Sequence, residues 1–384
     1  MKEAEGNEVE ELRGDEHRGR RGKWRIVLFA ALVATLLAGV IVAVFCFRQQ
    51  GVGEQLRALA GTEPGFYKEE VLGPGWYAKL ADKYKLPARR QPVTFFSRTV
   101  TDENMAVVGR AITLRDVSLS GSGISDAGMA HLKGLTKMRR LHLDNTKIGD
   151  AGLAHLSELT ELRILRLSGT KVSDAGLVHL KKLKNLQALG VNGTQVTDAG
   201  MAHLEGLTKL QILHLDNTKI GDAGLSHLSV LTELVGLYLQ GTKVSDAGLV
   251  HLKKFKNLHS LSLNDTEVTD EGLAQLCGFW NLSYLYLGGT QATDEGLVHL
   301  KKITYLRRLS LNGTQVTDEG LAQLSGFGEL FYLDLGGTRV TDAGLVHLKS
   351  LKRLRDLRLL GTRVTSEGVA DLKSAIPNVK VDFK

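Results

Sequence analysis

Cysteine and proline are scarce in this chain, and both shortages limit what it can be. Its 384 residues include two cysteines, Cys46 and Cys277. The first lies in an apolar run and the second in a repetitive segment, so we expect no intramolecular disulfide. Four of the five prolines fall between residues 64 and 92. They mark that region as a connecting segment.

A strong excess of charge of one sign is also lacking. The formal net charge is +7, and the seven basic and seven acidic residues among the first 25 cancel. A mild excess spread over a large surface does not indicate nucleic-acid binding, and it favours anionic partners such as polymers or lipid headgroups. The sequence shows no Ser/His/Asp or Cys/His constellation, phosphate-binding loop or paired carboxylates. We therefore predict that the chain is not an enzyme and binds no cofactor.

One long apolar run is present, residues 26–47, which contains no charged side chain. As a helix it would be about 33 Å long, enough to cross a bilayer. Five basic residues precede it closely and two follow it, which places the N-terminus in the cytoplasm. We predict a disordered cytoplasmic tail at residues 1–25, an uncleaved signal anchor at 26–47, and the remainder outside the cytoplasm. A cleaved signal peptide, whose apolar core is usually shorter, and a cytoplasmic chain are the alternatives.

A 24-residue unit fills the last two-thirds of the chain. Its marker is a hydroxyl residue that recurs in strict register at Ser122, Thr146, Thr170, Thr194, Thr218, Thr242, Thr266, Thr290, Thr314, Thr338 and Thr362. Seven apolar residues per unit point inward, with L-x-x-L-x-L spacing. A period of 20–29 residues is typical of a solenoid whose single units cannot bury their apolar face alone.

Each unit predicts one strand and one short helix. In the second unit, Leu165-x-Leu167 alternates with period two and residues 150–157 have helical character. A Ser or Thr at the third position, such as Thr197 or Thr269, can cap the helix, and the following Asp adds favourable charge. Gly stands at the sixth position of every unit, where neighbouring helices leave little room. The Thr hydroxyl points inward and needs a backbone partner, so we interpret the Thr column as structural.

The string from Thr341 to Leu359, T-D-A-G-L-V-H-L-K-S-L-K-R-L-R-D-L-R-L, resembles leucine-rich repeat proteins. The nearest subtype is the bacterial T-D-A-G-L form, similar to the cysteine-containing and ribonuclease-inhibitor-like class. The resemblance covers residues 112–384. It implies an α/β fold, a right-handed horseshoe of about eleven turns with parallel strands on the concave face and short helices on the convex face. It also implies recognition of a protein or polymer on the concave face.

Two other functions stay open on the sequence. The solenoid would serve as a structural or adhesive spacer that associates with itself, or as a cytoplasmic adaptor resembling F-box-type repeat proteins. In domain terms we predict a juxtamembrane stalk at residues 48–94, an N-terminal cap at 95–116 and a repeat domain with its C-terminal cap at 117–384. The predicted apolar residues of the N-terminal cap are Phe95, Val108, Ile112 and Leu114.

The chain contains its own comparison, because residues 139–192 match residues 211–264 at a shift of three units. Nine of the 13 differences fall on outward strand positions, although these make up 12 of the 54 positions compared. This bias indicates that the concave face was altered for contact. Its aromatic and charged candidates for ligand binding are Tyr238, Tyr284, Tyr286, Arg308, Tyr332, Asp334 and Arg358. A second, basic group suited to an acidic partner is Arg140, His142, Arg163 and Arg166.

Histidine recurs at the ninth position of eight units, from His131 to His347. A histidine ladder suggests a metal site, since imidazole is a common ligand. These residues lie on the convex side, however, without carboxylate or thiolate company. We attribute them to duplication and predict no metal. The expected partners are therefore a protein or anionic polymer, the membrane through residues 26–47, and possible further copies of the chain, with no nucleic acid.

Overall fold

The structure of the protein, a computed structural model, describes residues 52, 54–56, 58–59, 67–71 and 90–383. The chain divides into two compact units, residues 1–55 with 70–91 and residues 56–69 with 92–384, and the second unit holds the repeats. The predicted tail at 1–25 and the predicted anchor at 26–47 lie outside the described residues. Within the described ranges, no helix is long and apolar enough to cross a membrane.

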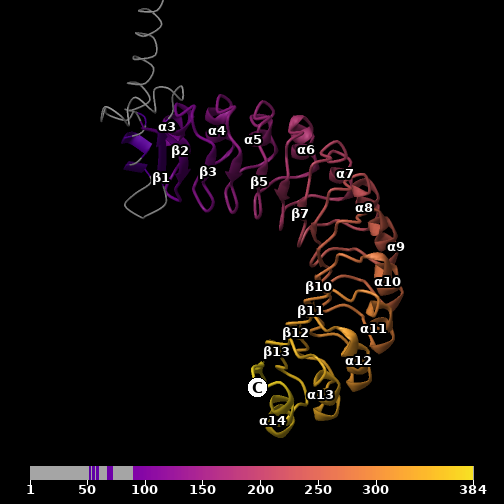
Figure 1. Ribbon diagram of the computed structural model, residues 1–384. Coiled ribbons are helices and arrows are strands. Elements are labelled where there is room, and N and C mark those ends of the chain that lie inside the picture. The colour runs from indigo at the N-terminus through magenta and orange to yellow at the C-terminus, as the bar shows by residue number, and fades with distance from the viewer. Residues whose placement is uncertain (1–51, 53, 57, 60–66, 72–89, 384) are drawn as a thin grey trace, which may run out of the picture. The chain divides into compact units, whose positions relative to one another are not determined.

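A single sheet of 14 strands runs in chain order from β1 to β14 (Figure 1). The strands are β1 (Tyr67–Val71), β2 (Arg90–Phe96), β3 (Asp116–Ser118), β4 (Arg140–His142), β5 (Ile164–Arg166), β6 (Ala188–Gly190), β7 (Ile212–His214), β8 (Gly236–Tyr238), β9 (Ser260–Ser262), β10 (Tyr284–Tyr286), β11 (Arg308–Ser310), β12 (Tyr332–Asp334), β13 (Asp356–Arg358) and β14 (Lys380–Asp382). From β2 onward neighbouring strands are parallel, and Leu285 of β10 faces Leu309 of β11. The predicted parallel repeat solenoid is confirmed.

One short helix follows each strand from β2 to β13. The α-helices are α3 (Met105–Gly109), α4 (Asp126–Met129), α5 (Asp150–Ala154), α6 (Asp174–Leu177), α7 (Asp198–Met201), α8 (Asp222–Leu228), α9 (Asp246–Leu249), α10 (Asp270–Gln275), α11 (Asp294–Leu300), α12 (Asp318–Ala322), α13 (Asp342–Leu348) and α14 (Ser366–Ala375). Short 3-10 segments are η1 (Asp102–Asn104), η2 (Ala130–Leu132), η3 (Val178–Lys182), η4 (Val250–Lys254), η5 (Leu276–Gly278) and η6 (Gln323–Gly326).

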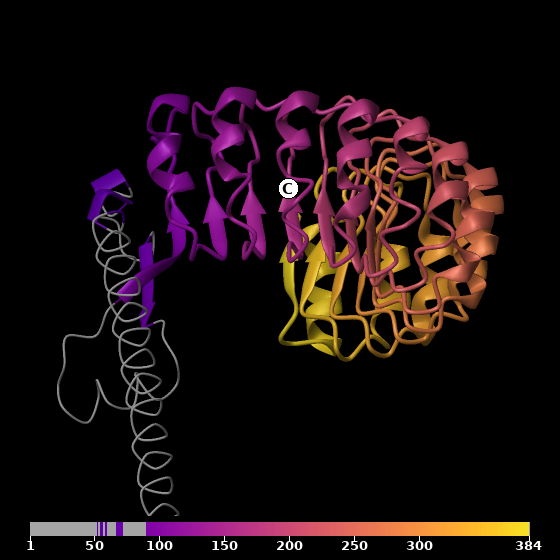
Figure 2. The ribbon, with the colours of Figure 1, turned by 90° about the horizontal axis from the view of Figure 1, so that it is seen from above.

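The repeat array curves, with the strands on its inner side and the helices on its outer side (Figures 1 and 2). The apolar residues of each unit account for this arrangement. In the second unit Leu153, Leu156, Leu165 and Leu167 are all fully buried. These leucines lie between the strand and the helix of their unit. The units stacked on either side cover them, so that the core is continuous along the array.

The helices are shorter than the sequence predicts. The segment expected at residues 150–157 forms α5 only as far as Ala154. The start of the helix follows the prediction where the cap is a hydroxyl residue: Thr197 Oγ1 accepts a hydrogen bond of 3.3 Å from Ala199 N, and Thr269 Oγ1 one from Glu271 N. The first turn is therefore capped in these units.

The aspartate that begins each helix from α4 to α13 joins its unit to the next one. Asp174 accepts hydrogen bonds from Thr197 N at 2.8 Å and from Thr197 Oγ1 at 2.6 Å. The same carboxylate explains the invariant glycine of the following helix, because a Cβ on Gly200 would lie 2.4 Å from Asp174 Oδ1. Glycine is therefore required at this position because the carboxylate of the preceding unit occupies the space of a Cβ, and not only because two helices approach closely.

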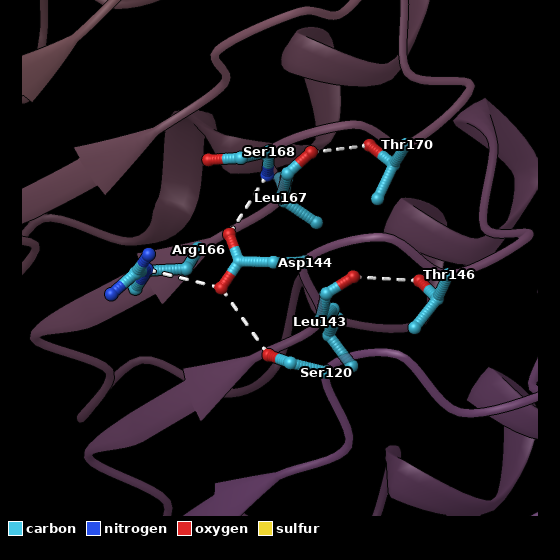
Figure 3. A network of polar contacts seen from close by, with 8 residues as sticks. All are labelled: Ser120, Leu143, Asp144, Thr146, Arg166, Leu167, Ser168 and Thr170. Carbon is cyan, nitrogen blue, oxygen red and sulfur yellow. Dashed lines mark hydrogen bonds and ion pairs between the residues drawn. The ribbon is translucent and has the colours of Figure 1, made fainter. Parts of the chain in front are cut away.

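The threonine column closes the turn that follows each strand. Thr146 Oγ1 donates to Leu143 O at 2.7 Å and Thr170 Oγ1 donates to Leu167 O at 2.6 Å (Figure 3). The same bond is made by Thr194, Thr218, Thr242, Thr266, Thr290, Thr314, Thr338 and Thr362. The residue before each threonine has a positive φ, for example 67° at Gly169 and 55° at Asn145. Such backbone suits Gly, Asn and Asp, which stand there.

At the N-terminal end two details differ from the sequence prediction. Strand β2 begins at Arg90, so the sheet starts inside the segment predicted as stalk. Ile112 was predicted to be a core residue of the cap, but it is 41% exposed and Ala111 is buried instead. The reason is a tight turn, in which Leu114 N donates to Ala111 O at 3.0 Å. This turn directs Ala111 and Leu114 inward and leaves Ile112 outside.

Candidate binding surface

The inner face is built from the two residues that flank the buried leucine of each strand. The parallel register stacks residues 24 positions apart into columns across the sheet. One column contains Tyr284, Arg308, Tyr332, Asp356 and Lys380. The next column contains Tyr286, Ser310, Asp334, Arg358 and Asp382. Five of the seven predicted ligand-binding residues therefore come from β10, β11 and β12, the sixth comes from β13, and Tyr238 comes from β8.

Tyr332 is the centre of a group of mutually contacting side chains, which we call the Tyr332 cluster (Arg308, Tyr332, Asp334 and Arg358). The guanidinium carbon of Arg308 lies 4.4 Å from the centre of the Tyr332 ring, and that of Arg358 lies 5.5 Å from it. Tyr332 Oη donates to Asp334 Oδ2 at 3.3 Å, and Arg358 Nη1 lies 3.9 Å from the same oxygen. Burial, followed by the Asp334 charge, raises the pKa of the Tyr332 phenol. The phenol therefore remains protonated and positioned.

An open hollow of about 660 Å³ adjoins the Tyr332 cluster. It is lined by Arg308, Tyr332, Asp356, Leu357, Arg358, Lys380, Val381 and Asp382. Among the described residues, Arg308 Nε is buried without a hydrogen-bond partner. A buried donor without a partner costs free energy. The hollow thus combines an aromatic ring with three cationic groups and two carboxylates, Asp356 and Asp382.

The other predicted tyrosines are placed differently. Tyr284 meets the His259 ring edge-on, with the ring centres 5.2 Å apart. Tyr238 stacks on His214 at 4.2 Å with the rings nearly parallel. A Cβ on Gly236 would lie 3.2 Å from Tyr238 Cε2, so the ring extends over that glycine. Tyr238 is therefore folded onto the sheet beside β7 and is separate from the Tyr332 cluster.

On the N-terminal side of Tyr238 the inner face has an aliphatic stretch that is not among the predicted sites. Ile164, Ala188 and Ile212 follow one another in a single column of β5, β6 and β7. Ile212 and the nearby Val235 are each 39% exposed. The alternation within each strand could have predicted this stretch, because all three residues occupy an outward position next to the buried leucine.

The predicted basic group is partly neutralised within the chain. Arg140 binds Asp116 through two hydrogen bonds, Nε to Oδ1 at 2.9 Å and Nη2 to Oδ2 at 2.6 Å. Arg166 Nε lies 3.0 Å from Asp144 Oδ2, which also accepts from Ser120 Oγ at 3.2 Å (Figure 3). Arg163 is exposed, and no described residue pairs with its guanidinium. Of the three predicted arginines, Arg163 is therefore the one whose charge is free for an acidic partner.

Two histidines of the inner face are held neutral. Burial, followed by the charge of Arg166, lowers the pKa of His142. Burial also lowers the pKa of His214, although the neighbouring Asp216 opposes the shift. Burial raises the pKa of Asp216, which accepts from Gln240 N at 3.0 Å and from Asn192 Nδ2 at 2.9 Å. Neither imidazole carries a fixed positive charge at neutral pH.

The repeated histidines lie on the outer helices. In the part of the chain that the structure describes, no three His, Cys, Asp or Glu side chains gather as a metal-binding set. The sequence predicts that these histidines have no carboxylate beside them. His227 is an exception, since its Nδ1 lies 2.7 Å from Glu205 Oε1. That pair is exposed and joins two neighbouring units.

Residues 113–379 match the family model described as a leucine-rich repeat region. The chain belongs to the leucine-rich repeat proteins. It aligns with the crystal structure of an internalin from Listeria monocytogenes at a TM-score of 0.56 and 21% identity, over 81% of this chain and 95% of the internalin. It aligns with a leucine-rich repeat protein of Leptospira interrogans at a TM-score of 0.51 and 17% identity, over 87% of this chain and 98% of that protein. No curated protein sequence matches it. The structural likeness, at these identities, shows the shared fold.

Proposed function

We propose that this leucine-rich repeat protein is a recognition module that binds a protein ligand on its inner face, with the Tyr332 cluster at the centre of the contact. The observation that supports this most directly is the packing of Arg308 and Arg358 against the Tyr332 ring beside an open hollow. Tyr and Arg are enriched among the residues that contribute most to protein binding. An inner surface of this kind is what solenoid proteins use for contact.

The cluster is suited to binding because its side chains are already ordered. Asp334 fixes the Tyr332 phenol and also accepts from Gly336 N at 3.0 Å. Ordering a long side chain on binding costs about 0.5–1.5 kcal/mol, and this cost is small for groups that are held in place beforehand. The hollow presents the cations Arg308, Arg358 and Lys380 beside the carboxylates Asp356 and Asp382, so a ligand carboxylate or carbonyl could pair with the cations. The fit favours a ligand segment with an acidic or carbonyl-rich surface.

The test is site-specific crosslinking in native membranes. A photoreactive amino acid at Tyr284 should attach to the ligand, and Tyr332→Ala in the same chain should reduce the yield about tenfold or more, as expected for a residue worth over 1.4 kcal/mol. The matched control places the photoreactive group at Lys181 on the outer side, which should give no attachment that depends on Tyr332. Equal yields with and without Tyr332→Ala, in a chain that still melts normally, would exclude the cluster.

We also propose that residues 26–47 anchor the chain in a membrane with the repeats outside the cytoplasm. The support is their length without charge and the five preceding basic residues. In intact cells, added protease should digest the repeat domain and spare the N-terminal tail. Protection of the repeats would instead favour the cytoplasmic adaptor function. An anionic polymer as ligand is the second candidate for the same surface, and crosslinking distinguishes it because no protein would be attached.

A further inference from the structure

The two long edges of the repeat array differ in chemistry near its C-terminal end. Because all strands from β2 onward are parallel, the turns that lead into them share one edge, and the turns that leave them share the opposite edge. We call these the entry rim (277–283, 301–307, 325–331 and 349–355) and the exit rim (265–271, 289–295 and 313–319). Both rims flank the inner face, and the last residue of each entry-rim segment adjoins it, as Phe331 does beside Arg308.

The entry rim is aromatic and basic. Trp280 and Tyr305, on consecutive units, are 63% and 65% exposed, more than any other large apolar side chain described. Exposed aromatic side chains in contiguous groups mark sites of association. Four exposed cations lie on the same rim without a side-chain partner among the described residues: Lys301, Lys302, Arg307 and Arg355. The remaining charges of this rim are paired, as Arg353 is with Glu329.

Tyr305 occupies a position that two other units use for a hydrogen bond to a neighbouring unit and that six units fill with a charged residue. Asn185 Nδ2 donates to Thr160 O at 3.0 Å, and Asn281 Nδ2 donates to Lys256 O at 3.0 Å, each joining two neighbouring units. Tyr305 stands at the same place in its unit and has no amide to donate. That unit therefore lacks a structural hydrogen bond and presents an exposed ring. The exposed ring therefore adds apolar area to this rim at a position that varies among the units.

The exit rim of the same units is acidic. Glu267, Glu271, Glu295 and Glu319 are all exposed. Seven of the eleven units have alanine where Glu271, Glu295 and Glu319 stand. Earlier units carry Lys147, Lys171, Lys219 and Lys243 at the place of Glu267. This edge is thus acidic between about residues 266 and 319, beside the aromatic part of the entry rim, and carries arginine again at Arg339 and Arg363.

We propose that the entry rim of one copy of this chain binds the exit rim of a second copy. Opposite charges attract and orient the two rims, while two entry rims repel one another. The aromatic rings supply apolar contact area. Since the two rims are different surfaces on opposite edges, the contact is heterologous and extends into an open row of copies instead of closing as a two-fold dimer. The inner face remains free, so the contact is independent of the proposed ligand binding.

A charge-swap experiment on the full chain in detergent tests this contact by sedimentation velocity. One variant carries Glu271→Lys, Glu295→Lys and Glu319→Lys, and the other carries Lys301→Glu, Lys302→Glu and Arg307→Glu. The unchanged chain should associate as its concentration rises, and each variant alone should associate about tenfold or more weakly, because like charges then meet. An equimolar mixture of the two variants should associate again, since each altered rim finds a complementary rim on the other.

Two further variants separate this contact from general charge effects. Tyr305→Asn should weaken association while leaving the melting temperature unchanged or higher, because it supplies the amide found at Asn185 and Asn281. The control Lys133→Glu, Lys137→Glu and Arg139→Glu makes the same charge change on the entry rim of the first unit and should leave association unaltered. A chain that stays monomeric at all concentrations, a mixture that does not associate, or an equal loss in the control would each overturn the proposal. Ligand crosslinking at Tyr284 would be unaffected by any of these results.

Discussion

On the inner face, strands β4 to β7 carry arginine and aliphatic side chains, whereas β10 to β13 carry tyrosine together with arginine. The arginines of the first region are largely bound to aspartate, as Arg140 is to Asp116. In the second region Arg308 packs on an aromatic ring and keeps an unused donor. The turns that leave the strands differ as well, because they carry Lys147 and Lys171 in the first region and Glu295 and Glu319 in the second. Two surfaces of different chemistry thus occur on one backbone.

The framework beneath these surfaces is the same in both regions. Asp150 accepts from Ser173 N at 2.7 Å and from its hydroxyl at 2.5 Å. Asp294 accepts from Thr317 N at 2.8 Å and from its hydroxyl at 2.6 Å. The leucines, the glycines and the threonine column are equally regular. The comparison teaches that this array separates stability, which resides in its repeated positions, from contact, which resides in the positions that vary.

The largest effect is expected from removing a core leucine, and it should be equal in the two regions. Leu165→Ala in β5 and Leu309→Ala in β11 each empty a fully buried site. Each should lower the free energy of unfolding by about 2–5 kcal/mol, through lost burial and the cavity left behind. Urea denaturation monitored by circular dichroism measures it. Ile212→Ala on the exposed face is the control. A much smaller loss at Leu309 would show that the frameworks are not equivalent.

A smaller effect, which should differ between units, is expected from the aspartate at the start of each helix. Asp294→Ala removes two hydrogen bonds from Thr317, whereas Asp198→Ala removes only the one from Gly221 N at 2.7 Å. Hydrogen bonds to charged groups are worth about 1.5–3 kcal/mol each. We expect a loss of about 3 kcal/mol for Asp294→Ala and about half of that for Asp198→Ala. Equal losses in urea denaturation would mean that the hydroxyl contact adds nothing.

The aspartate ladder shows where sequence reasoning stops. The period, the strands, the buried leucines and the fold follow from spacing alone, because apolar periodicity determines which side chains must be covered. That Asp174 bonds to Thr197, 23 residues later, does not follow, since the contact depends on how closely two units stack. The positive φ before each threonine was readable, because Gly, Asn and Asp alone occupy that place.

The same limit applies to the candidate surface. Alternation within the strands placed Tyr284, Arg308 and Tyr332 on the inner face, as the structure has them. It did not show that Arg140 and Arg166 are bound to aspartates, or that Tyr238 stacks on His214, because those contacts join different units. Trp280 and Tyr305 were missed because they lie in the turns, where no periodicity distinguishes exposed residues from covered ones.

The first unit offers a smaller test, which should raise stability. Ser122 is the first member of the hydroxyl column, and its buried oxygen has no hydrogen-bond partner among the described residues. Every threonine in the other ten units donates to a backbone carbonyl, as Thr146 does. Ser122→Thr should add this bond and a methyl contact and stabilise the chain by about 0.5–1.5 kcal/mol. Thr146→Ser should lose a similar amount. A destabilised Ser122→Thr variant, seen in thermal melting, would show that the first unit does not share the geometry of the others.

The finest comparison concerns His142 and His214, which occupy the same column of the inner face in β4 and β7. Burial lowers the pKa of both histidines, and the charge of Arg166 lowers it further. At His142 the Arg166 charge is the strongest charge effect. At His214 it is weaker than the opposing effect of Asp216. Arg166→Ala should therefore raise the pKa of His142 more than that of His214. Titration of the imidazole protons by nuclear magnetic resonance measures both values in one sample.

The sign of the accompanying stability change follows from the same shifts. A histidine whose pKa is lowered by folding takes up its proton first in the unfolded chain, so stability is complete above the unfolded pKa of about 6.5 and declines as the pH falls below it. Arg166→Ala should make that decline shallower, because it brings the His142 pKa closer to the unfolded value. An equal pKa shift at the two histidines would mean that the charge of Arg166 acts equally at β4 and β7. The strands at the N-terminal end of the inner face would then form one electrostatic region.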